Sequence, residues 1–290
     1  MNNYHQSVLV KEVIDGLRVE KNKKYIDATL GGGGHAEQIL KLGGEVLGID
    51  VDQEAIAHAE KKVKSQKSKV KHWERLKLMR GNFRDIDKIA SDTNFEKVAG
   101  IIFDLGVSSH QIDTPTRGFS FQNEGPLDMR MDQELEVRAL DLIKILTQRQ
   151  LYEIFTKFGE ENRAWSISDG IVRARSIKPI VTTGDLAKIV FTRAGQSKRV
   201  FQALRIVVND ELSALQEALP KTVKLLEQNG RICVISFHSL EDRIVKRKFI
   251  EFEEKGLGRI ITKKPIVPSK EELRINKRAR SAKLRIFALR

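Results

Sequence analysis

The stretch Lys24–Asp52, KYIDATLGGGGHAEQILKLGGEVLGIDVD, decides how the rest of the chain is interpreted. The apolar run Tyr25–Ala28, with one β-branched member, is typical of a buried strand. Four glycines, Gly31–Gly34, separate it from a segment of helical composition at His35–Leu40. A second apolar run then ends in an acid, over Val46–Asp50. Strand, glycine turn, helix, strand and terminal acid predict the first half of a nucleotide-binding α/β sheet.

The glycine turn and Asp50 also predict a ligand. Glycines let the backbone approach a ligand closely, and a helix N-terminus offers unpaired N–H donors. An acid about 20 residues past the glycines can accept hydrogen bonds from a ribose diol. A glycine cluster alone is a weak signal, because many such clusters are only turns. With both strands and Asp50 in place we expect a nucleoside-type cofactor, and Gly31-x-Gly33-x-x-Ala36 leaves NAD and S-adenosylmethionine (SAM) both open.

Length and composition restrict the class of protein. The 290 residues allow one large or two ordinary domains, and the 40% hydrophobic share is globular. No run approaches the roughly 18 apolar residues of a membrane span, and Met1–Gln6 lacks the features of a signal peptide. The single cysteine, Cys233, excludes an intramolecular disulfide and a cysteine metal cluster, and its apolar neighbours favour a core position. We expect a cytoplasmic protein with no metal and no membrane partner.

The positive charge is concentrated near the C-terminus. The formal net charge is +13, and Lys255–Arg290 holds twelve lysines and arginines against two glutamates. A solvated face is the usual explanation of a charge run, but an excess of one sign in one segment favours a phosphate-backbone partner. Anionic membrane is less favoured because the segment is not cleanly amphipathic. Nucleic acid is therefore the expected partner.

Further strands and helices extend the first βαβ unit. We expect a short helix over Ser7–Leu17, a third strand at Leu76–Met79 and a fourth at Val98–Asp104. Three successive strands then end in polar or ligand-type residues, at Asp50, Asn82-Phe83 and Asp104. Because ligands bind at the carboxyl ends of parallel strands, these residues are expected to meet over the glycine turn.

The parallel pattern stops after this point. Gln111–Arg130 is expected to be a loop, and the chain is then helical, without a comparable strand signal, as far as Arg199. We predict a helical substrate-recognition domain at 111–199, inserted between the two parts of a sheet domain at 1–110 and 200–290.

The second part of the sheet domain is expected to complete the sheet. It consists of a helical stretch, Val200–Asn229, interrupted at Pro220, a strand at Arg231–Ser236 and an edge strand at Lys283–Leu289. The resulting fold class is α/β, a Rossmann-like seven-stranded sheet of the class I SAM-dependent methyltransferase type with a helical insertion.

Several runs, in the same order along nearly the whole chain, resemble the bacterial 16S rRNA cytosine-N4 methyltransferase family of the RsmH/MraW type. The matching runs are Asp27–His35, Asp104–Ser109, Arg117–Phe121, Gly125–Asp132, Phe201–Ile206, Ser236–Arg243 and Arg278–Ser281. The resemblance implies a cytoplasmic enzyme with SAM as its cofactor. It also implies methylation of the exocyclic N4 of a decoding-region cytidine in 16S rRNA of the small ribosomal subunit.

The resemblance also implies particular cofactor contacts. The residues of this chain that match them are Gly33, Gly34, His35, Asp50, Phe83, Asp104 and Gln111. Departures from the family pattern fall in three loops: His110 stands in place of proline, Gly195–Arg199 replaces His-Pro-Ala-Thr-Arg, and Lys277 replaces the proline of Asn-Pro-Arg. These loops concern RNA recognition more than cofactor binding.

Methyl transfer to the cytosine amine needs alignment and an acceptor near the amine, since its lone pair is delocalised into the ring. The candidates for this acceptor are Asp104, Ser108, Asp128 and His238, each of which also has an ordinary structural explanation. An NAD-dependent oxidoreductase would share the glycine turn but leave the basic segment unexplained. A non-catalytic RNA-binding factor would leave the cofactor turn without a role. A hydrolase based on Ser236, His238 and Asp242 lacks the G-x-S-x-G elbow.

Overall fold

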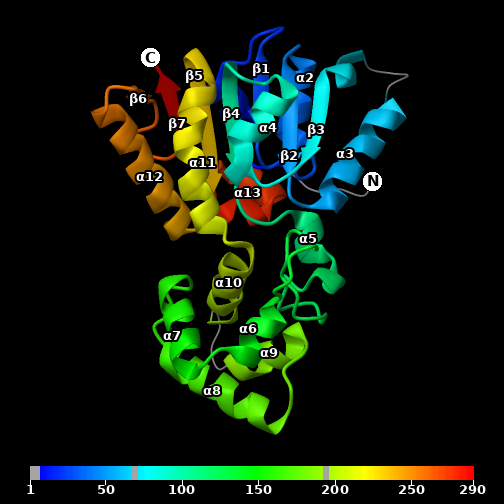
Figure 1. The fold of residues 1–290 in the computed structure, drawn as a ribbon, viewed down its shortest axis with the longest axis vertical. Helices are drawn as coiled ribbons and strands as arrows, with labels where there is room; N and C mark the ends of the chain where they lie inside the picture. The colour runs from blue at the N-terminus through cyan, green and yellow to red at the C-terminus, as the bar shows by residue number, and fades with distance from the viewer. Residues whose placement is uncertain (1–6, 67–70, 192–195) are drawn as a thin grey trace. The chain divides into compact units, whose positions relative to one another are not determined.

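The computed structural model of the chain describes residues 7–66, 71–191 and 196–290 (Figure 1). The predictions for Met1–Gln6 and for Gly195 lie outside this range. The chain forms two compact units. We call Met1–Gly106 with Leu212–Arg290 the sheet unit, and Val107–Glu211 the helical unit.

The sheet unit contains one seven-stranded sheet in the order β3-β2-β1-β4-β5-β7-β6. Neighbouring strands from β3 to β5 are parallel, and β7 is antiparallel to both β5 and β6. This is the Rossmann-like sheet of the class I SAM-dependent methyltransferases, so the predicted fold class is confirmed. The strands are β1 (Lys24–Asp27), β2 (Glu45–Asp50), β3 (Leu76–Arg80), β4 (Val98–Asp104), β5 (Leu226–Ser236), β6 (Gly258–Ile260) and β7 (Lys283–Leu289).

Helices cover both faces of this sheet. On one face, α1 (Val10–Leu17), α2 (Gly34–Lys41) and α3 (Gln53–Gln66) contribute to a core that includes Tyr25 and Cys233. On the other face, α4 (Ile86–Thr93), α11 (Glu211–Leu225) and α12 (Ser239–Glu254) pack on Ile26, Phe103 and other strand residues. Adjacent strand residues such as Tyr25 and Ile26 belong to opposite cores, as side-chain alternation along a strand requires. Cys233 is fully buried, as predicted.

Short elements connect these layers. They are η1 (Lys71–Arg75), η2 (Phe83–Asp85), α13 (Lys270–Ile275) and η4 (Lys277–Ser281). The basic segment from Lys255 to Arg290 is therefore folded into the sheet unit, because it supplies β6, α13, η4 and β7. No helix within the described residues is both long enough and apolar enough to cross a membrane.

The helical unit has its own hydrophobic core. Its helices are α5 (Ser109–Asp113), η3 (Pro115–Arg117), α6 (Ala139–Ile145), α7 (Gln148–Lys157), α8 (Ala164–Ile177), α9 (Thr183–Val190) and α10 (Gln196–Asn209). Leu151, Phe155 and Ile171 are fully buried there. Val200 and Leu204 of α10 belong to the same core, so the compact unit continues to Glu211 and does not end near Arg199.

Four local expectations from the sequence are wrong. The helical stretch after Val200 breaks at Asp210, which has a φ of 48°, and not at Pro220, which lies inside α11. A proline deletes a single backbone donor, and α11 tolerates that loss because Ala214, Leu215, Ala218 and Leu219 anchor it in the core. The strand β7 is an inner strand, since the three-residue β6 pairs with it and forms the edge.

The other two errors concern the start of the first helix and the long loop. The helix α1 begins at Val10, since Leu9 has a left-handed conformation with a φ of 53°. Ser7–Leu9 instead contacts the glycine turn, as described below. The predicted loop Gln111–Arg130 contains most of α5 and all of η3.

Candidate functional site

The glycine turn follows β1 at the carboxyl edge of the sheet and leads directly into α2. Gly31 and Gly33 have φ values of 50° and 71°, which side chains rarely adopt. A Cβ on Gly34 would lie 2.1 Å from the Ser7 hydroxyl oxygen, so a larger residue does not fit there. Gly33, the N-cap of α2, has no side chain to cap the helix, and the Asp27 carboxylate bonds the backbone N–H of Ala36, the third helical residue. The N–H groups of Gly34 and His35, which precede Ala36, are therefore the ones placed for a ligand that approaches the turn.

Asp50 at the end of β2 holds the turn in place. Its two carboxylate oxygens accept hydrogen bonds from the backbone N–H of Gly31 (2.8 Å) and of Asp52 (2.9 Å). Burial raises the pKa of Asp50 to about 6, although these two hydrogen bonds favour the ionised form. Each oxygen keeps a further lone pair, so the carboxylate can accept from a ligand hydroxyl as predicted.

Asp27, the last residue of β1, is a site residue that the sequence analysis did not single out. Its side chain is 1% exposed and accepts a hydrogen bond from the N–H of Thr29 at 3.3 Å. Burial raises the pKa of Asp27 to about 6, and the charge of His35 and the Thr29 N–H oppose that rise. Asp27 was predictable by the same argument as Asp50 and Asp104, because β1 ends in an acid as β2 and β4 do.

His35 and Asp104 lie together beside Asp27. The imidazole Nε2 of His35 is 3.0 Å from the carbonyl oxygen of Val8, and Nδ1 is 3.7 Å from Oδ2 of Asp104. A carbonyl only accepts, so Nε2 carries a proton and donates it. The ring is 3% exposed and is fixed with Nδ1 towards the Asp104 carboxylate. His35 therefore lies next to Asp104, while a direct contact with a cofactor remains a prediction.

Phe83 follows β3 at the same edge of the sheet. Its ring packs edge-on against Phe103 of β4, with centroids 5.6 Å apart and an angle of 86° between the rings. The preceding Asn82 accepts from the N–H of Arg84 at 2.9 Å and so fixes the turn that carries Phe83. A half-buried aromatic ring held in this way is suited to an adenine face.

His238 follows β5 and has a structural role. It is the N-cap of α12, where its Nδ1 accepts from the N–H of Glu241 and its Nε2 lies 3.1 Å from Oε1 of Glu241. Glu241 is 2% exposed, and its other oxygen accepts from the N–H of Phe237 at 2.8 Å. Both ring nitrogens of His238 thus face Glu241, which makes His238 a weak candidate for chemistry.

The remaining predicted residues belong to the helical unit. Ser108 and Gln111 bond each other in a capping box at the start of α5, where the Ser108 N–H donates to Oε1 of Gln111 at 2.9 Å. Asp128 forms a two-point ion pair with Arg130, with both N–O distances at 2.8 Å. Both oxygens of Asp128 are therefore already bonded.

The basic C-terminal segment adjoins the glycine turn through shared contacts. Ala279 and Ala282, within and just after η4, are buried in the same core as Leu30 and Ala36 of the turn. The backbone N–H of Leu9 donates to Glu272 of α13 at 2.8 Å. In contrast, Lys277, Arg278 and Arg280 of η4 are exposed.

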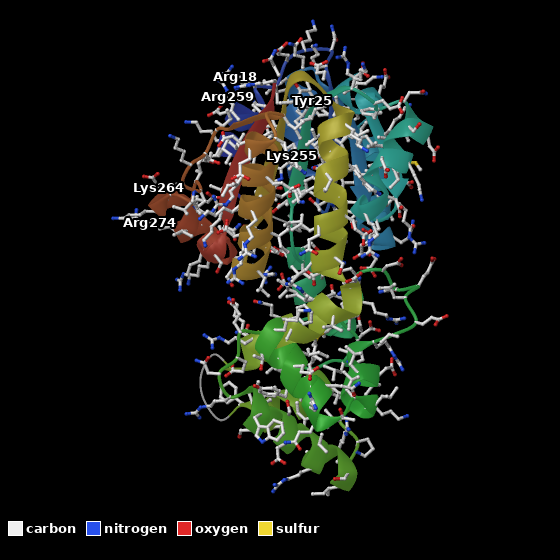
Figure 2. All side chains as sticks on the ribbon, turned by 60° about the vertical axis from the view of Figure 1, so that its left-hand side comes forward. Arg18, Tyr25, Lys255, Arg259, Lys264 and Arg274 are labelled. Carbon is white, nitrogen blue, oxygen red and sulfur yellow. The ribbon has the colours of Figure 1, made fainter. Side chains whose placement is uncertain are left out.

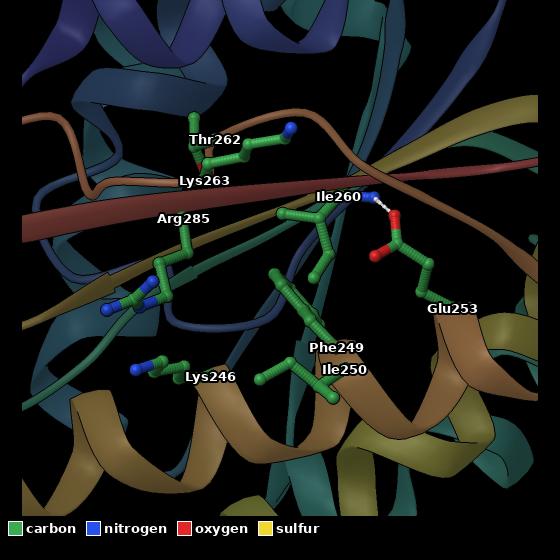
Figure 3. A pocket seen from close by; sticks show the side chains of 8 residues that line it. All are labelled: Lys246, Phe249, Ile250, Glu253, Ile260, Thr262, Lys263 and Arg285. Atoms are coloured by element: carbon green, nitrogen blue, oxygen red, sulfur yellow. Dashed lines mark hydrogen bonds between the residues drawn. The ribbon is translucent and has the colours of Figure 1, made fainter.

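A cavity of about 250 Å³ lies between α12 and the β6–β7 edge (Figure 3). Its apolar floor is formed by Phe249, Ile250 and Ile260. Arg285 at its rim is paired with Asp242 at 2.6 Å, which lowers the pKa of that acid. Figure 3 shows Lys246 with its charged end on the same side as Arg285, so the cavity joins an apolar floor to a basic rim.

Comparison with known proteins identifies the family. The model of the MraW methylase family matches residues 2–290. The chain is 44% identical to the ribosomal RNA small subunit methyltransferase H of Clostridium botulinum (strain Loch Maree / Type A3), over 97% of each chain. It is also 44% identical to the protein of the same name from Halothermothrix orenii, again over 97% of each chain. A solved structure of an rRNA methylase from Streptococcus thermophilus aligns over 98% of this chain and 97% of that chain, with 12% identity and a TM-score of 0.48.

The sheet order and the match to a methylase family together identify SAM as the cofactor, as the sequence predicted. The residues of the turn fit this group. The glycine backbone is open to a ligand at Gly33, and three acids, Asp27, Asp50 and Asp104, end strands at the edge of the sheet that carries the turn, which suits a cofactor with positive charge. The predicted family is confirmed, and the chain belongs to the MraW methylase family.

Proposed function

We propose that this chain transfers a methyl group from SAM to the exocyclic N4 of a decoding-region cytidine in 16S rRNA. The observation that supports the cofactor half is the glycine turn held by Asp50 next to the pair of His35 and Asp104. The RNA half is supported by the relatives, which are named small-subunit rRNA methyltransferases, and by the exposed cations of η4. The choice of N4 rests on the family runs in the sequence. Such an enzyme works in the cytoplasm, where small subunits are assembled.

The chain's own groups would hold SAM in a defined way. The first N–H groups of α2, after Gly33 and Gly34, would donate to the methionine carboxylate. Asp50 would accept from the ribose hydroxyls through its remaining lone pairs. Phe83 would lie against the adenine, and the family resemblance adds a contact from Gln111.

When bound, SAM supplies an electrophilic methyl group on a positively charged sulfur. The cytosine amine is a poor nucleophile, so an acceptor at the amine is needed to localise its lone pair and receive the developing charge. Asp104 is the best candidate, because it ends β4 at the same edge as the glycine turn and lies next to His35. Asp128 and His238 are bonded by Arg130 and Glu241, which makes them weaker candidates. Ser108 keeps a hydroxyl proton and is the second candidate.

The helical unit would position the target base. A base in an rRNA stack has to leave that stack to reach a methyl group inside a protein site. The sheet unit already contains the predicted cofactor contacts other than Gln111. Presenting the RNA is therefore the role that we assign to residues 107–211.

Two other functions lose support from the structure. In dinucleotide-binding sheets the strands are typically all parallel, whereas β7 here is antiparallel and lies between β5 and β6. The hydrolase alternative fails because Ser236 is 2% exposed and its hydroxyl lies against the Lys283 carbonyl, while Asp242 is paired with Arg285. A non-catalytic RNA-binding role is separated from methyl transfer only by assay.

The test is methyl transfer from labelled SAM to purified small subunits that lack the modification, followed by mass spectrometry of the nucleosides. We expect label in N4-methylcytidine, with large subunits as the negative control. The Asp104→Asn variant is expected to bind SAM but to transfer methyl roughly a hundredfold more slowly, the scale of one lost electrostatic contact to a transition state. Label on cytosine C5 or on a ribose oxygen, or no label despite binding of SAM and subunits, would overturn the proposal.

A further inference from the structure

A second cavity lies at the opposite, amino edge of the parallel strands. It has a volume of about 550 Å³ and is bounded by the end of α1, the starts of β4, β5 and β6, and the end of β7. Five basic residues line it: Arg18, Lys23, Arg231, Arg259 and Arg290. The volume is within the range of about 300–1,000 Å³ that is usual for small-molecule sites.

A large bulge in β5 builds one wall of this cavity. Leu226 pairs with Val98 of β4, and the next paired residue is Arg231, which lies opposite Gly100. The four residues 227–230 therefore face a single residue of β4, Ala99, and Asn229 among them has a φ of 64°. Bulges of this kind redirect side chains and are frequent beside functional sites. Here the bulge carries Arg231 at its end.

Arg231 is a buried cation that no acid compensates within the described chain. Its side chain is 7% exposed, and Nη1 donates to the carbonyl oxygen of Gly16 at 2.7 Å. Burial lowers the pKa of Arg231, and the positive charges of Arg18 and Arg259 lower it further. A buried charge surrounded by like charges is costly unless an ion of opposite sign completes the site.

The two glutamates that line the cavity interact with a different residue, Lys23. Glu227 forms an ion pair with Lys23 at 2.9 Å, and Glu227 and Glu20 both raise the pKa of Lys23. Neither glutamate is paired with Arg231 in the described chain, where its printed partner is the Gly16 carbonyl. Figure 2 shows Arg18 and Arg259 beside each other at one end of the sheet unit, away from Lys264 and Arg274. The guanidinium groups thus form an uncompensated set.

We propose that this amino-edge cavity is an anion site that binds a phosphate group between Arg18, Arg231 and Arg259. Guanidinium groups bind phosphate oxygens through paired N–H donors, and several of them around one anion share its charge. The phosphate belongs either to a small phosphate compound or to an RNA backbone. Both sources present the same oxyanion to the three arginines.

The test uses pyrophosphate as the probe, titrated by calorimetry into the full-length protein with SAM at saturation. SAM is present so that the probe cannot occupy the cofactor turn. We expect saturable binding that is weakened at least tenfold in the double variant Arg18→Gln/Arg259→Gln. Both substituted residues are exposed, so the fold should persist, and an unchanged melting temperature checks this. The matched control is Lys264→Gln/Arg274→Gln, which removes two exposed cations outside the cavity.

Competition with a short single-stranded RNA distinguishes the two sources. RNA that displaces pyrophosphate from both the wild-type protein and the control variant supports the site and assigns it to an RNA backbone. Pyrophosphate binding that RNA does not affect also supports the site and assigns it to a small phosphate compound. No saturable binding of pyrophosphate, or an equal loss of binding in the control variant, would overturn the proposal.

Discussion

The two ends of the same parallel strands carry buried charges of opposite sign. At the carboxyl edge, Asp27 and Asp50 accept hydrogen bonds from backbone N–H groups. At the amino edge, Arg231 donates to the backbone carbonyl of Gly16, close to the end of α1. In a βα sheet the helices begin at the carboxyl edge and end at the amino edge, so their positive and negative ends meet these charges. The direction of the chain thus determines which charge each edge can bury.

The same comparison indicates what each edge can bind. Burial raises the pKa values of Asp27 and Asp50 to about 6 and lowers the pKa of Arg231. At both edges, burial therefore disfavours the charged form of these side chains. Titratable groups with shifted pKa values in a concave site are typical of ligand-binding positions. A cofactor with a positive sulfur suits the acidic edge, and a phosphate suits the basic edge.

The largest expected effect at the acidic edge follows from Gly33→Val. Gly33 has a φ of 71°, and a β-branched residue there costs about 1–3 kcal/mol of backbone strain. Relief of that strain would move the N–H groups at the start of α2, so SAM affinity should fall by roughly a hundredfold. Calorimetry of SAM binding measures this change directly.

Gly256→Val is the matched control for this substitution. Gly256 has a similar φ of 70° and no atom within 4 Å of a Cβ position, and it lies after α12, away from the turn. The two variants should lose similar thermal stability, but only Gly33→Val should lose SAM affinity. Equal SAM affinity in the two variants would show that the turn is not the cofactor site.

A smaller effect is expected from the exposed cations of η4. Replacement of Lys277, Arg278 and Arg280 by glutamine should weaken RNA binding and lower the salt slope by about one unit for each lost phosphate contact. SAM affinity should remain unchanged, because these side chains are exposed and are not among the predicted cofactor contacts. Fluorescence titration of RNA at several salt concentrations gives the slope.

The control for this triple variant is the replacement of Lys21, Lys97 and Lys255 by glutamine. These lysines are also exposed, so the net charge changes equally. A salt slope that falls by the same amount in both triple variants would attribute RNA binding to net charge alone and contradict a specific role for η4.

The strands were predictable where apolar residues run consecutively, as at Val98–Asp104 and Arg231–Ser236. The three-residue β6 could not be predicted, because pairing with β7 and not its own composition makes it a strand. The break at Asp210 was also hidden. It depends on a left-handed residue and on Asn209, whose side chain bonds the backbone of Met129 and Met131.

The sequence predicted those residues of the site that lie at the ends of strands. Asp50 and Asp104 were recognised as strand-terminal acids, but the contact between Val8 and His35 joins residues far apart in sequence and gave no local signal. The structural roles of Asp128 and His238 were equally invisible, since an ion pair and a helix cap need three-dimensional neighbours. The arginines of the amino edge are dispersed along the chain and meet only in the fold.

The most direct measurement of the cofactor site is the SAM affinity of the wild-type protein and of Asp50→Asn at pH 7.5 and at pH 5. Because the pKa of Asp50 is about 6, the carboxylate is ionised at pH 7.5 and about nine-tenths protonated at pH 5. The wild-type protein should therefore lose about tenfold in affinity at pH 5 beyond any loss in Asp50→Asn, which should already bind about 1–3 kcal/mol more weakly at pH 7.5. Equal affinities of the two proteins at pH 7.5, with the same pH dependence, would contradict the assignment of SAM to the carboxyl edge.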